Sequence, residues 1–258
     1  METSRALFDL AGRVALVTGA ARGLGRATAA ALGAHGAAVV LADLDGPACE
    51  AAAAELRAVG VDTLAVYCDV GDAAAGARLA DLAGAWRGRI DVLVCNAGVQ
   101  GPAGPLAAMA DADWDRVFDV NLRGAARLAN RIVPAMAGQG GGSVIFMSSI
   151  AALRGNRAIG LYGMSKAALS QLARNLAVEW GPRGVRVNAI APGLIRTPLA
   201  AGLLACDAFM ERRLAMTPLR RVGEPHEIAG VAVMLASKAG GFITGQTLVV
   251  DGGTLITD

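Results

Sequence analysis

The chain has few of the residues from which metal sites and many hydrolytic centres are built. It holds two histidines, His35 and His226, which lie far apart, and its four cysteines form no C-x-x-C pair. We therefore expect no bound metal and no histidine-based catalytic centre. The scattered cysteines, which we expect to be buried thiols, are Cys49, Cys68, Cys95 and Cys206.

The sequence also lacks a large excess of charge of one sign and long apolar runs. The net charge is +2 without a basic run, which gives no electrostatic basis for binding nucleic acid or a membrane surface. The opening stretch METSRALFDLAGR mixes charges and has no long apolar core, so we expect no signal peptide. The longest uncharged run, 132–153, is broken by Pro134 and by GQGGG and is not expected to cross a membrane. These features predict a cytoplasmic protein.

No linker rich in proline or serine and no block of charge divides the 258 residues. Hydrophobic residues make up 54% of the chain and charged residues 18%, which argues against disorder. Single α/β domains often reach this length. We expect residues 1–258 to form one domain.

Short apolar runs alternate with segments of helical character along the whole chain. Most of the runs are apolar on both faces, which is typical of a parallel sheet covered by helices on both sides. Strands are expected at 13–18, 37–42, 62–68, 91–95, 143–147, 185–190 and 247–250. Helices are expected up to about 35, at 47–59, 72–86 and 113–136, after the fifth strand, at 199–216 as one or two short pieces, and at 224–236.

A glycine-rich loop, TGAARGLG at 18–25, lies between the first strand and its helix. Gly19, Gly23 and Gly25 would let the backbone approach a pyrophosphate, whose charge the helix N-terminus favours. Asp43, at the end of the second strand, is placed to bind the ribose hydroxyls of an adenosine. Taken alone, the loop could be only a tight turn, and Asp43 only a helix cap or a turn aspartate.

A serine, a tyrosine and a lysine follow the fifth strand with a regular spacing. Tyr162 and Lys166, at i and i+4, would share one helix face, and Ser149 would stand just past the strand. A cation near a phenol favours the phenolate, so the tyrosine could exchange a proton with an alcohol or ketone at neutral pH. Y-x-x-x-K is nevertheless common, and a surface tyrosine beside a solvated lysine gives the same pattern.

Six motifs in order resemble the short-chain dehydrogenase/reductase family, of its shorter, single-domain type. They cover the chain from about residue 10 to 253. The motifs are TGAARGLG at 18–25, CNAG at 95–98, NLRG from Asn121, the trio of Ser149, Tyr162 and Lys166, PGLIRTP at 192–198, and the tail ITGQTLVVDGG. The resemblance implies a doubly wound Rossmann fold with a seven-stranded, mostly parallel sheet and helices on both faces.

The resemblance also implies a role for each matching residue. Tyr162 would be the general acid/base, Lys166 would lower its pKa and bind the nicotinamide ribose, and Ser149 would orient the substrate oxygen. Asn121 would hold a water in a proton relay, although it could instead only kink its own helix. The other implied cofactor-binding residues are Gly19, Arg22, Gly23, Leu24, Gly25, Asp43, Asp69, Val70, Asn96, Ala97, Gly98, Pro192, Gly193, Ile195 and Thr197.

The function predicted from this resemblance is hydride transfer between a nicotinamide cofactor and a secondary alcohol or ketone. An NADPH-dependent 3-ketoacyl-thioester reductase and a catalytically silent NAD-binding regulator stay open as alternatives. Asp43 would repel a 2′-phosphate, whereas Arg22 is a basic residue where NADP-preferring relatives often carry one, so we expect NAD to be preferred and NADP to remain possible. By analogy with the family, a homotetramer is expected.

Two segments bear on the substrate. The stretch 199–216 is rich in apolar side chains, which predicts a mobile lid over the nicotinamide, unless it is an ordinary helix packed into the core. Arg154 and Arg157 lie between Ser149 and Tyr162 and could contact an anionic group of the substrate, but a solvated loop is the simpler explanation for them.

Overall fold

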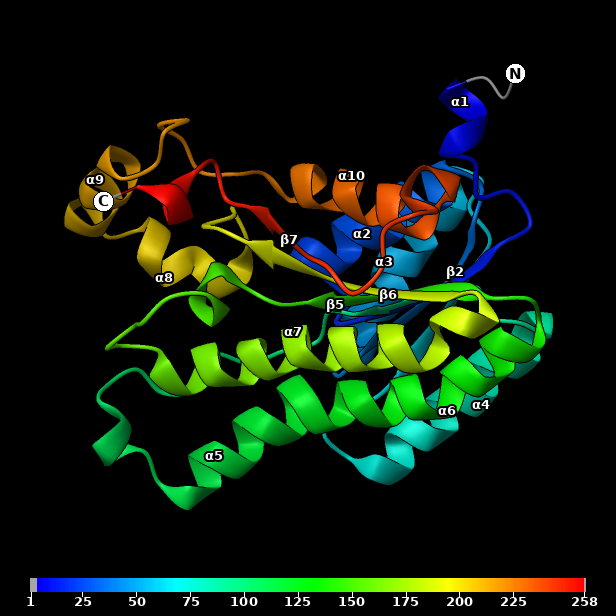
Figure 1. The fold of residues 1–258 in the computed structure, drawn as a ribbon, viewed down its shortest axis with the longest axis horizontal. Coiled ribbons are helices and arrows are strands. Elements are labelled where there is room, and N and C mark those ends of the chain that lie inside the picture. Colours follow the sequence, from blue (N-terminus) through cyan, green and yellow to red (C-terminus); the bar gives the residue numbers. More distant parts are fainter. Residues whose placement is uncertain (1–3, 258) are drawn as a thin grey trace.

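Seven strands form one sheet in the computed structural model, which describes residues 4–257 (Figure 1). Every strand pairs in parallel with its neighbours, in the order β3-β2-β1-β4-β5-β6-β7. The prediction of a doubly wound, seven-stranded sheet is thus confirmed. The strands are β1 Val14–Thr18, β2 Ala38–Asp43, β3 Thr63–Tyr67, β4 Val92–Cys95, β5 Gly142–Met147, β6 Val185–Pro192 and β7 Thr247–Val250.

Helices connect the strands and cover both faces of the sheet. Asp45 and Asp72 begin two of them, each accepting hydrogen bonds from backbone N–H groups of the first turn, and Pro47 lies in a first turn as expected. The helices are α1 Ser4–Leu7, α2 Gly23–Ala34, α3 Gly46–Ala58, α4 Ala73–Arg87, α5 Asp111–Phe118, α6 Gly124–Gly138, α7 Gly160–Trp180, α8 Ala201–Leu204, α9 Asp207–Ala215 and α10 Pro225–Ala236.

One predicted helix differs in detail. The pattern at 113–136 predicts a single α-helix, but the structure has α5 and α6 joined by one π-helical turn, Asp119–Arg123. The turn inserts where Asn121 turns its side chain inward and binds residues outside its own helix. The apolar pattern does not reveal such a turn, because one π-helical turn is short and the segments on both sides keep the period of an α-helix.

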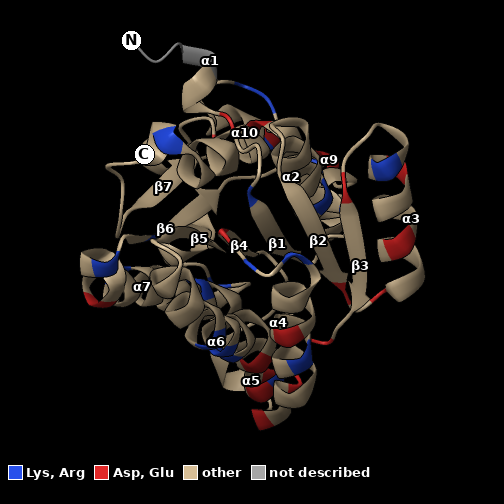
Figure 2. Ribbon diagram, turned by 90° about the vertical axis from the view of Figure 1, so that its right-hand side faces the viewer, with Lys and Arg blue, Asp and Glu red and all other residues tan. Residues whose placement is uncertain are grey.

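Two apolar layers enclose the sheet. Helices α4, α6 and α7 pack on one face, around Leu93, Phe146 and Leu128. Helices α2, α3 and α10 pack on the other, around Val17 and Ile145 (Figure 1). Charged residues lie mainly on the outer sides of the helices, and the strands are almost free of them (Figure 2). The buried sheet therefore presents polar groups chiefly at its ends.

Three of the cysteines are buried, as predicted. Burial raises the pKa of the Cys49 and Cys68 thiols to about 11 and that of Cys95 to about 12. The prediction is wrong for Cys206, which is exposed just before α9, because α8 and α9 carry no buried side chain. In the described part of the chain, no helix is both long and apolar enough to cross a membrane.

Candidate active site

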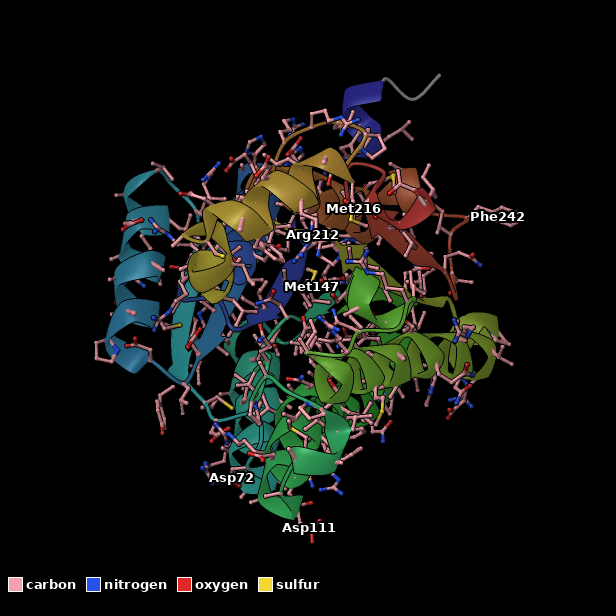
Figure 3. The ribbon with its side chains drawn as sticks, turned by 90° about the vertical axis from the view of Figure 1, so that its left-hand side faces the viewer. Asp72, Asp111, Met147, Arg212, Met216 and Phe242 are labelled. Carbon is pink, nitrogen blue, oxygen red and sulfur yellow. The ribbon has the colours of Figure 1, made fainter. Side chains whose placement is uncertain are left out.

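A cavity of about 610 Å³ opens at the carboxyl edge of the sheet, where the strand order reverses between β1 and β4. Figure 3 looks toward this edge, with Met147 near the centre and Arg212 and Met216 of the α9 region above it. Parallel sheets bind ligands at this position. Of the residues predicted for the site, the cavity is lined by Gly19, Arg22, Gly23, Leu24, Asp43, Asp69, Val70, Asn96, Ala97, Gly98, Ser149, Tyr162, Lys166, Pro192, Gly193, Ile195 and Thr197.

The glycine loop at the start of α2 is shaped for close approach of the backbone. Gly19 has a φ of +64°, and a Cβ on it would lie 2.8 Å from Nδ2 of Asn96. Gly25 is not among the cavity-lining residues, and a Cβ on it would lie 2.0 Å from the carbonyl oxygen of Gly19. Arg22 is the N-cap residue of α2 and makes no side-chain cap hydrogen bond. The first N–H groups of α2 therefore remain available to an anion, which fits a pyrophosphate.

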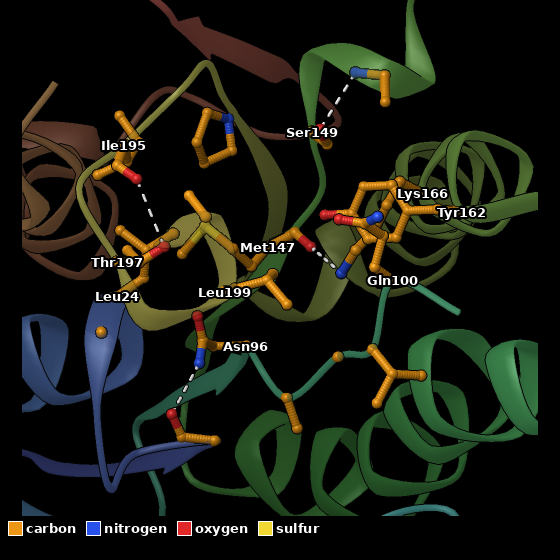
Figure 4. Close-up of a pocket in the computed structure, with 18 of the residues that line it drawn as sticks. Leu24, Asn96, Gln100, Met147, Ser149, Tyr162, Lys166, Ile195, Thr197 and Leu199 are labelled. Atoms are coloured by element: carbon orange, nitrogen blue, oxygen red, sulfur yellow. Dashed lines mark hydrogen bonds between the residues drawn. The ribbon is translucent and has the colours of Figure 1, made fainter. Parts of the chain in front are cut away.

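Asn96 holds the glycine loop against β4. Its Nδ2 donates to the carbonyl oxygens of Thr18 at 2.9 Å and Gly19 at 3.0 Å. In return, the Thr18 hydroxyl accepts from the backbone N–H groups of Asn96 and Ala97, both at 3.1 Å. The two strand ends at the switch point are thus tied together by side chains (Figure 4).

Acidic side chains mark the end of the cavity near β2 and β3. Asp43 accepts hydrogen bonds from the backbone N–H groups of Ala21 at 2.9 Å and Asp45 at 3.0 Å. Arg22 forms its ion pair with Asp45, at 2.5 Å, and not with Asp43. Asp69, next to Val70, lies 3.4 Å from Arg116.

Tyr162, Lys166 and Ser149 meet at the other end of the cavity. Tyr162 and Lys166 lie one turn apart on α7, and the Lys166 Nζ is 5.6 Å from the centre of the Tyr162 ring. The same Nζ donates to the carbonyl oxygen of Met147 at 2.8 Å (Figure 4). Ser149 begins the short 3₁₀ helix Ile150–Ala152, and its hydroxyl accepts from the N–H of Ala151 at 3.1 Å.

Burial changes the pKa of both titratable groups. It raises the pKa of the Tyr162 phenol, against the opposing effect of the neighbouring Ser149 hydroxyl. It lowers the pKa of Lys166 to about 8. The sequence predicts that Lys166 lowers the pKa of Tyr162, and the structure shows a shift in the other direction. The reason is that desolvation of the phenol outweighs its polar contacts.

Asn121 lies behind the cavity, fully buried in the π-helical turn. Its Oδ1 accepts from the N–H of Val99 at 2.8 Å, and its Nδ2 donates to Val99 O and to Ser165 Oγ, both at 2.9 Å. Ser165 Oγ in turn donates to the carbonyl oxygen of Tyr162 at 2.8 Å. A Cβ on Gly98 would lie 3.2 Å from Oδ1 of Asn121 and 3.1 Å from Nζ of Lys166. Asn121 therefore joins the loop after β4 to the turn of α7 that carries Tyr162 and Lys166.

The segment after β6 covers the cavity. The backbone N–H of Gly193 donates to Val250 O at 2.9 Å, and the Thr197 hydroxyl donates to Ile195 O at 3.4 Å. Leu199 and Leu203 line the cavity and are 59% and 40% exposed, so they are not packed into the core. Because α8 and α9 bury no residue, the alternative of an ordinary core helix at 199–216 is wrong. Mobility of this segment stays a prediction.

Several residues of the site were not predicted from the sequence. Asp45 is the ion-pair partner of Arg22. Ser165 links Asn121 to the backbone of Tyr162. Arg213 lines the cavity. Of the two arginines proposed for an anion, Arg154 lines the cavity, whereas Arg157 is exposed and is not among its lining residues. Of these residues, only Ser165 could have been suspected from the sequence, because it lies between Tyr162 and Lys166.

Comparison with known proteins agrees with this geometry. A family model described as enoyl-(acyl carrier protein) reductase matches residues 19–254. The chain is 40% identical to dehydrogenase/reductase SDR family member 4 of Bos taurus, over 94% of this chain and 87% of that protein. It is 42% identical to cis-4-hydroxycyclohexanecarboxylate dehydrogenase of Sinomonas cyclohexanicum, over 93% of this chain and 96% of that protein.

A solved structure is similar over almost the whole chain. It is a 7α-hydroxysteroid dehydrogenase complexed with NADH and 7-oxo glycochenodeoxycholic acid. The TM-score is 0.94 at 36% identity, and the match covers 98% of each chain.

Proposed function

The chain belongs to the short-chain dehydrogenase/reductase family, and we propose that Tyr162 is the group that exchanges a proton with its substrate. As a member of this family, it is a nicotinamide-dependent oxidoreductase that interconverts alcohols and ketones. The observation that supports the role of Tyr162 is the convergence of Tyr162, Ser149 and Lys166 at one end of a single cavity.

The residues present fit a dinucleotide cofactor. The uncapped N-terminus of α2 and the tightly packed Gly19 and Gly25 suit a pyrophosphate, Asp43 suits a ribose, and Lys166 suits the second ribose. Ile195 and Thr197 would hold the carboxamide, and Asp69 and Val70 the adenine. When bound, such a cofactor supplies the hydride acceptor for the alcohol and the hydride donor for the ketone.

The proton is handled by the side chains of this chain. In ketone reduction, the Tyr162 phenol donates its proton to the carbonyl oxygen that becomes the alcohol. In alcohol oxidation, the phenolate takes the hydroxyl proton. Ser149 donates a hydrogen bond to the same substrate oxygen and holds it beside the phenol. The raised pKa of Tyr162 keeps it protonated at neutral pH, which favours its role as an acid.

Asn121 has a positioning role in this proposal. Its three hydrogen bonds occupy both polar atoms of its side chain and fix the Val99 loop relative to α7. It thereby sets the place of Lys166 relative to Gly98.

We propose NAD as the preferred cofactor. A 2′-phosphate would lie near the carboxylates of Asp43 and Asp45, and Leu44 supplies no cation. Arg22, the one basic residue of the loop, is already paired with Asp45. At about 4 Å and an effective dielectric of about 20, one such repulsion is roughly 4 kcal/mol before screening. The carboxylates therefore outweigh the arginine.

We also propose that the protein is a homotetramer, by analogy with its family. The C-terminal region offers apolar surface for such contacts, because Phe242 is fully exposed and Val249 on the edge strand β7 is 40% exposed. Light scattering of the purified protein tests this assignment.

A substrate panel tests the function itself. The purified protein is assayed with secondary alcohols and ketones, with hydroxy acids such as cis-4-hydroxycyclohexanecarboxylate, and with acetoacetyl-CoA, each with both nicotinamide cofactors. Turnover of alcohols or ketones with NAD(H) supports the proposal. Turnover confined to the thioester with NADPH would favour the reductase alternative. Cofactor binding without any turnover would favour a silent NAD-binding protein.

A further inference from the structure

Two arginines from separate segments line the cavity that also holds Ser149 and Tyr162. Arg154 follows the short helix Ile150–Ala152, and Arg213 lies on α9. Both line the cavity, and both are half-buried. They are close enough for the charge of Arg154 to lower the pKa of Arg213, in addition to the larger effect of burial.

These two guanidinium groups differ from the other arginines of the cavity. Arg22 is paired with Asp45 and Arg116 with Asp69. Among residues 4–257, neither Arg154 nor Arg213 has a carboxylate within ion-pair distance, and the Arg213 guanidinium packs over the Phe209 ring at 5.4 Å.

Asp251 is the acidic residue that acts on Arg213, but it is engaged elsewhere. Its Oδ1 accepts from the N–H of Gly253 at 2.8 Å, and its Oδ2 accepts from the N–H of Leu255 at 2.7 Å. Its negative charge raises the pKa of Arg213. Burial and the charges of Arg154 and Arg212 lower the same pKa, and each of these effects is larger than that of Asp251. Asp251 therefore offsets only part of the positive charge of Arg154 and Arg213.

An arginine stays charged at any working pH, so two of them held close together repel each other. A bound anion removes this repulsion. The planar fork of a guanidinium matches a carboxylate, to which it donates two parallel hydrogen bonds. The lining of the same cavity also includes the apolar side chains of Ile150, Leu199 and Leu203. Such a site fits a molecule with an apolar body and one carboxylate.

We propose that the substrate is a hydroxy acid or keto acid whose carboxylate is bound by Arg154 and Arg213, while its carbinol or carbonyl group lies at Ser149 and Tyr162. This inference rests on the proposed function and adds the class of substrate. Because Arg213 is on α9 and Arg154 is on the segment after β5, a carboxylate bound by both would also join α9 to the body of the protein. The anion thus favours closure of the cavity.

The test uses one pair of substrates of equal shape, cis-4-hydroxycyclohexanecarboxylate and its primary carboxamide. The wild-type enzyme should oxidise the acid with a kcat/KM about 10- to 100-fold above that of the amide, the range expected for one charge-assisted pair. Arg154→Met and Arg213→Met keep most of the side-chain volume and should remove this preference. Arg213→Lys should restore part of it. Wild-type enzyme that uses both equally well, or prefers the amide, would overturn the inference.

Two neighbouring arginines are matched controls. Arg157→Met is on the same loop as Arg154, and Arg212→Met is next to Arg213, but both side chains are exposed and neither lines the cavity. Their ratio of acid to amide should stay within about twofold of wild type. If the control variants lost the preference for the acid to the same extent, the preference would come only from the overall positive charge of this region, and the specific site would be refuted.

Two further measurements separate the possible failures. Calorimetric titration of the acid into the complex of enzyme and NADH needs no turnover. If the acid binds to the wild type and not to Arg213→Met, the carboxylate site is supported even if the proposed function fails. Absence of such binding, in an enzyme that oxidises neutral alcohols, refutes the site and leaves the function standing. A 3-hydroxyacyl-CoA carries phosphate groups as its anion. If substitution of the two arginines lowered turnover of this substrate alone, the proposed carboxylate site would be refuted.

Discussion

Lys166 donates a hydrogen bond from Nζ to the carbonyl oxygen of Met147, 2.8 Å away, and so ties α7 to the end of β5. The lysine is buried, and burial lowers its pKa from 10.5 to about 8. A buried ammonium group is stable only where its environment compensates for lost hydration. The hydrogen bond therefore connects α7 to β5, whereas burial of the charged lysine lowers the stability of the folded protein by an amount that depends on pH.

The first prediction concerns this cost. Below about pH 8 the lysine is charged in both the folded and the unfolded protein, and the cost of burying the charge is fully present. As the pH rises from about 8 to 10.5, the folded protein has lost the proton and the unfolded protein still binds it, so the wild type gains stability. Relative to Lys166→Met, the gain in unfolding free energy should be about 3 kcal/mol, at about 1.4 kcal/mol per pKa unit.

Urea unfolding at several pH values measures this difference. Lys238→Met removes a lysine that is exposed and serves as the control for the loss of a lysine as such. A difference between wild type and Lys166→Met that does not change between about pH 7 and 10 would contradict the lowered pKa.

The second prediction concerns the proton donor. Tyr162→Phe keeps the ring and removes the phenol, so kcat should fall by about 10²- to 10⁴-fold, while NADH binding measured by fluorescence changes little. In the wild type, kcat for alcohol oxidation should rise with pH above neutrality, because the raised pKa keeps the phenol protonated at pH 7. Tyr67→Phe, at a tyrosine that is 67% exposed, is the control and should stay active. Turnover of Tyr162→Phe within tenfold of wild type would refute the assignment.

The third prediction concerns cofactor choice. Asp45→Asn should release Arg22 while keeping a side chain that can cap α3, and so raise kcat/KM with NADP relative to NAD. Asp43→Ser should relax the preference further, and adding Leu44→Arg should reverse it. The measurement is the ratio of kcat/KM with NAD to that with NADP. A wild-type ratio near one would show that Arg22 offsets both carboxylates despite its ion pair.

The fourth prediction concerns the glycine loop. In Gly25→Ala the new Cβ would meet the Gly19 carbonyl oxygen at 2.0 Å, so the loop must shift and both stability and dinucleotide affinity should fall. The loss in unfolding free energy should be about 1–3 kcal/mol or more. Gly84→Ala in α4 is the control, because nothing lies within 4 Å of its new Cβ, and it should stabilise the helix by about 0.5–1 kcal/mol. Unchanged NADH binding in Gly25→Ala would contradict the role of the loop.

The sequence alone determined the features that depend on neighbouring residues. The apolar runs predicted all seven strands, the glycine spacing predicted the turn before α2, and the i, i+4 spacing placed Tyr162 and Lys166 on one helix face. These follow from backbone geometry and from the period of a helix or strand, which are local properties.

Only the tertiary structure decided how distant groups meet. Arg22 pairs with Asp45 rather than Asp43. Arg213 lines the same cavity as Arg154, although a long helix, one strand and a short helix lie between them in the chain. The direction of the Tyr162 shift also depended on burial, which raises the pKa where the sequence predicted a decrease. Pairing and desolvation depend on the surroundings of a side chain in space, and these surroundings arise only when the chain has folded.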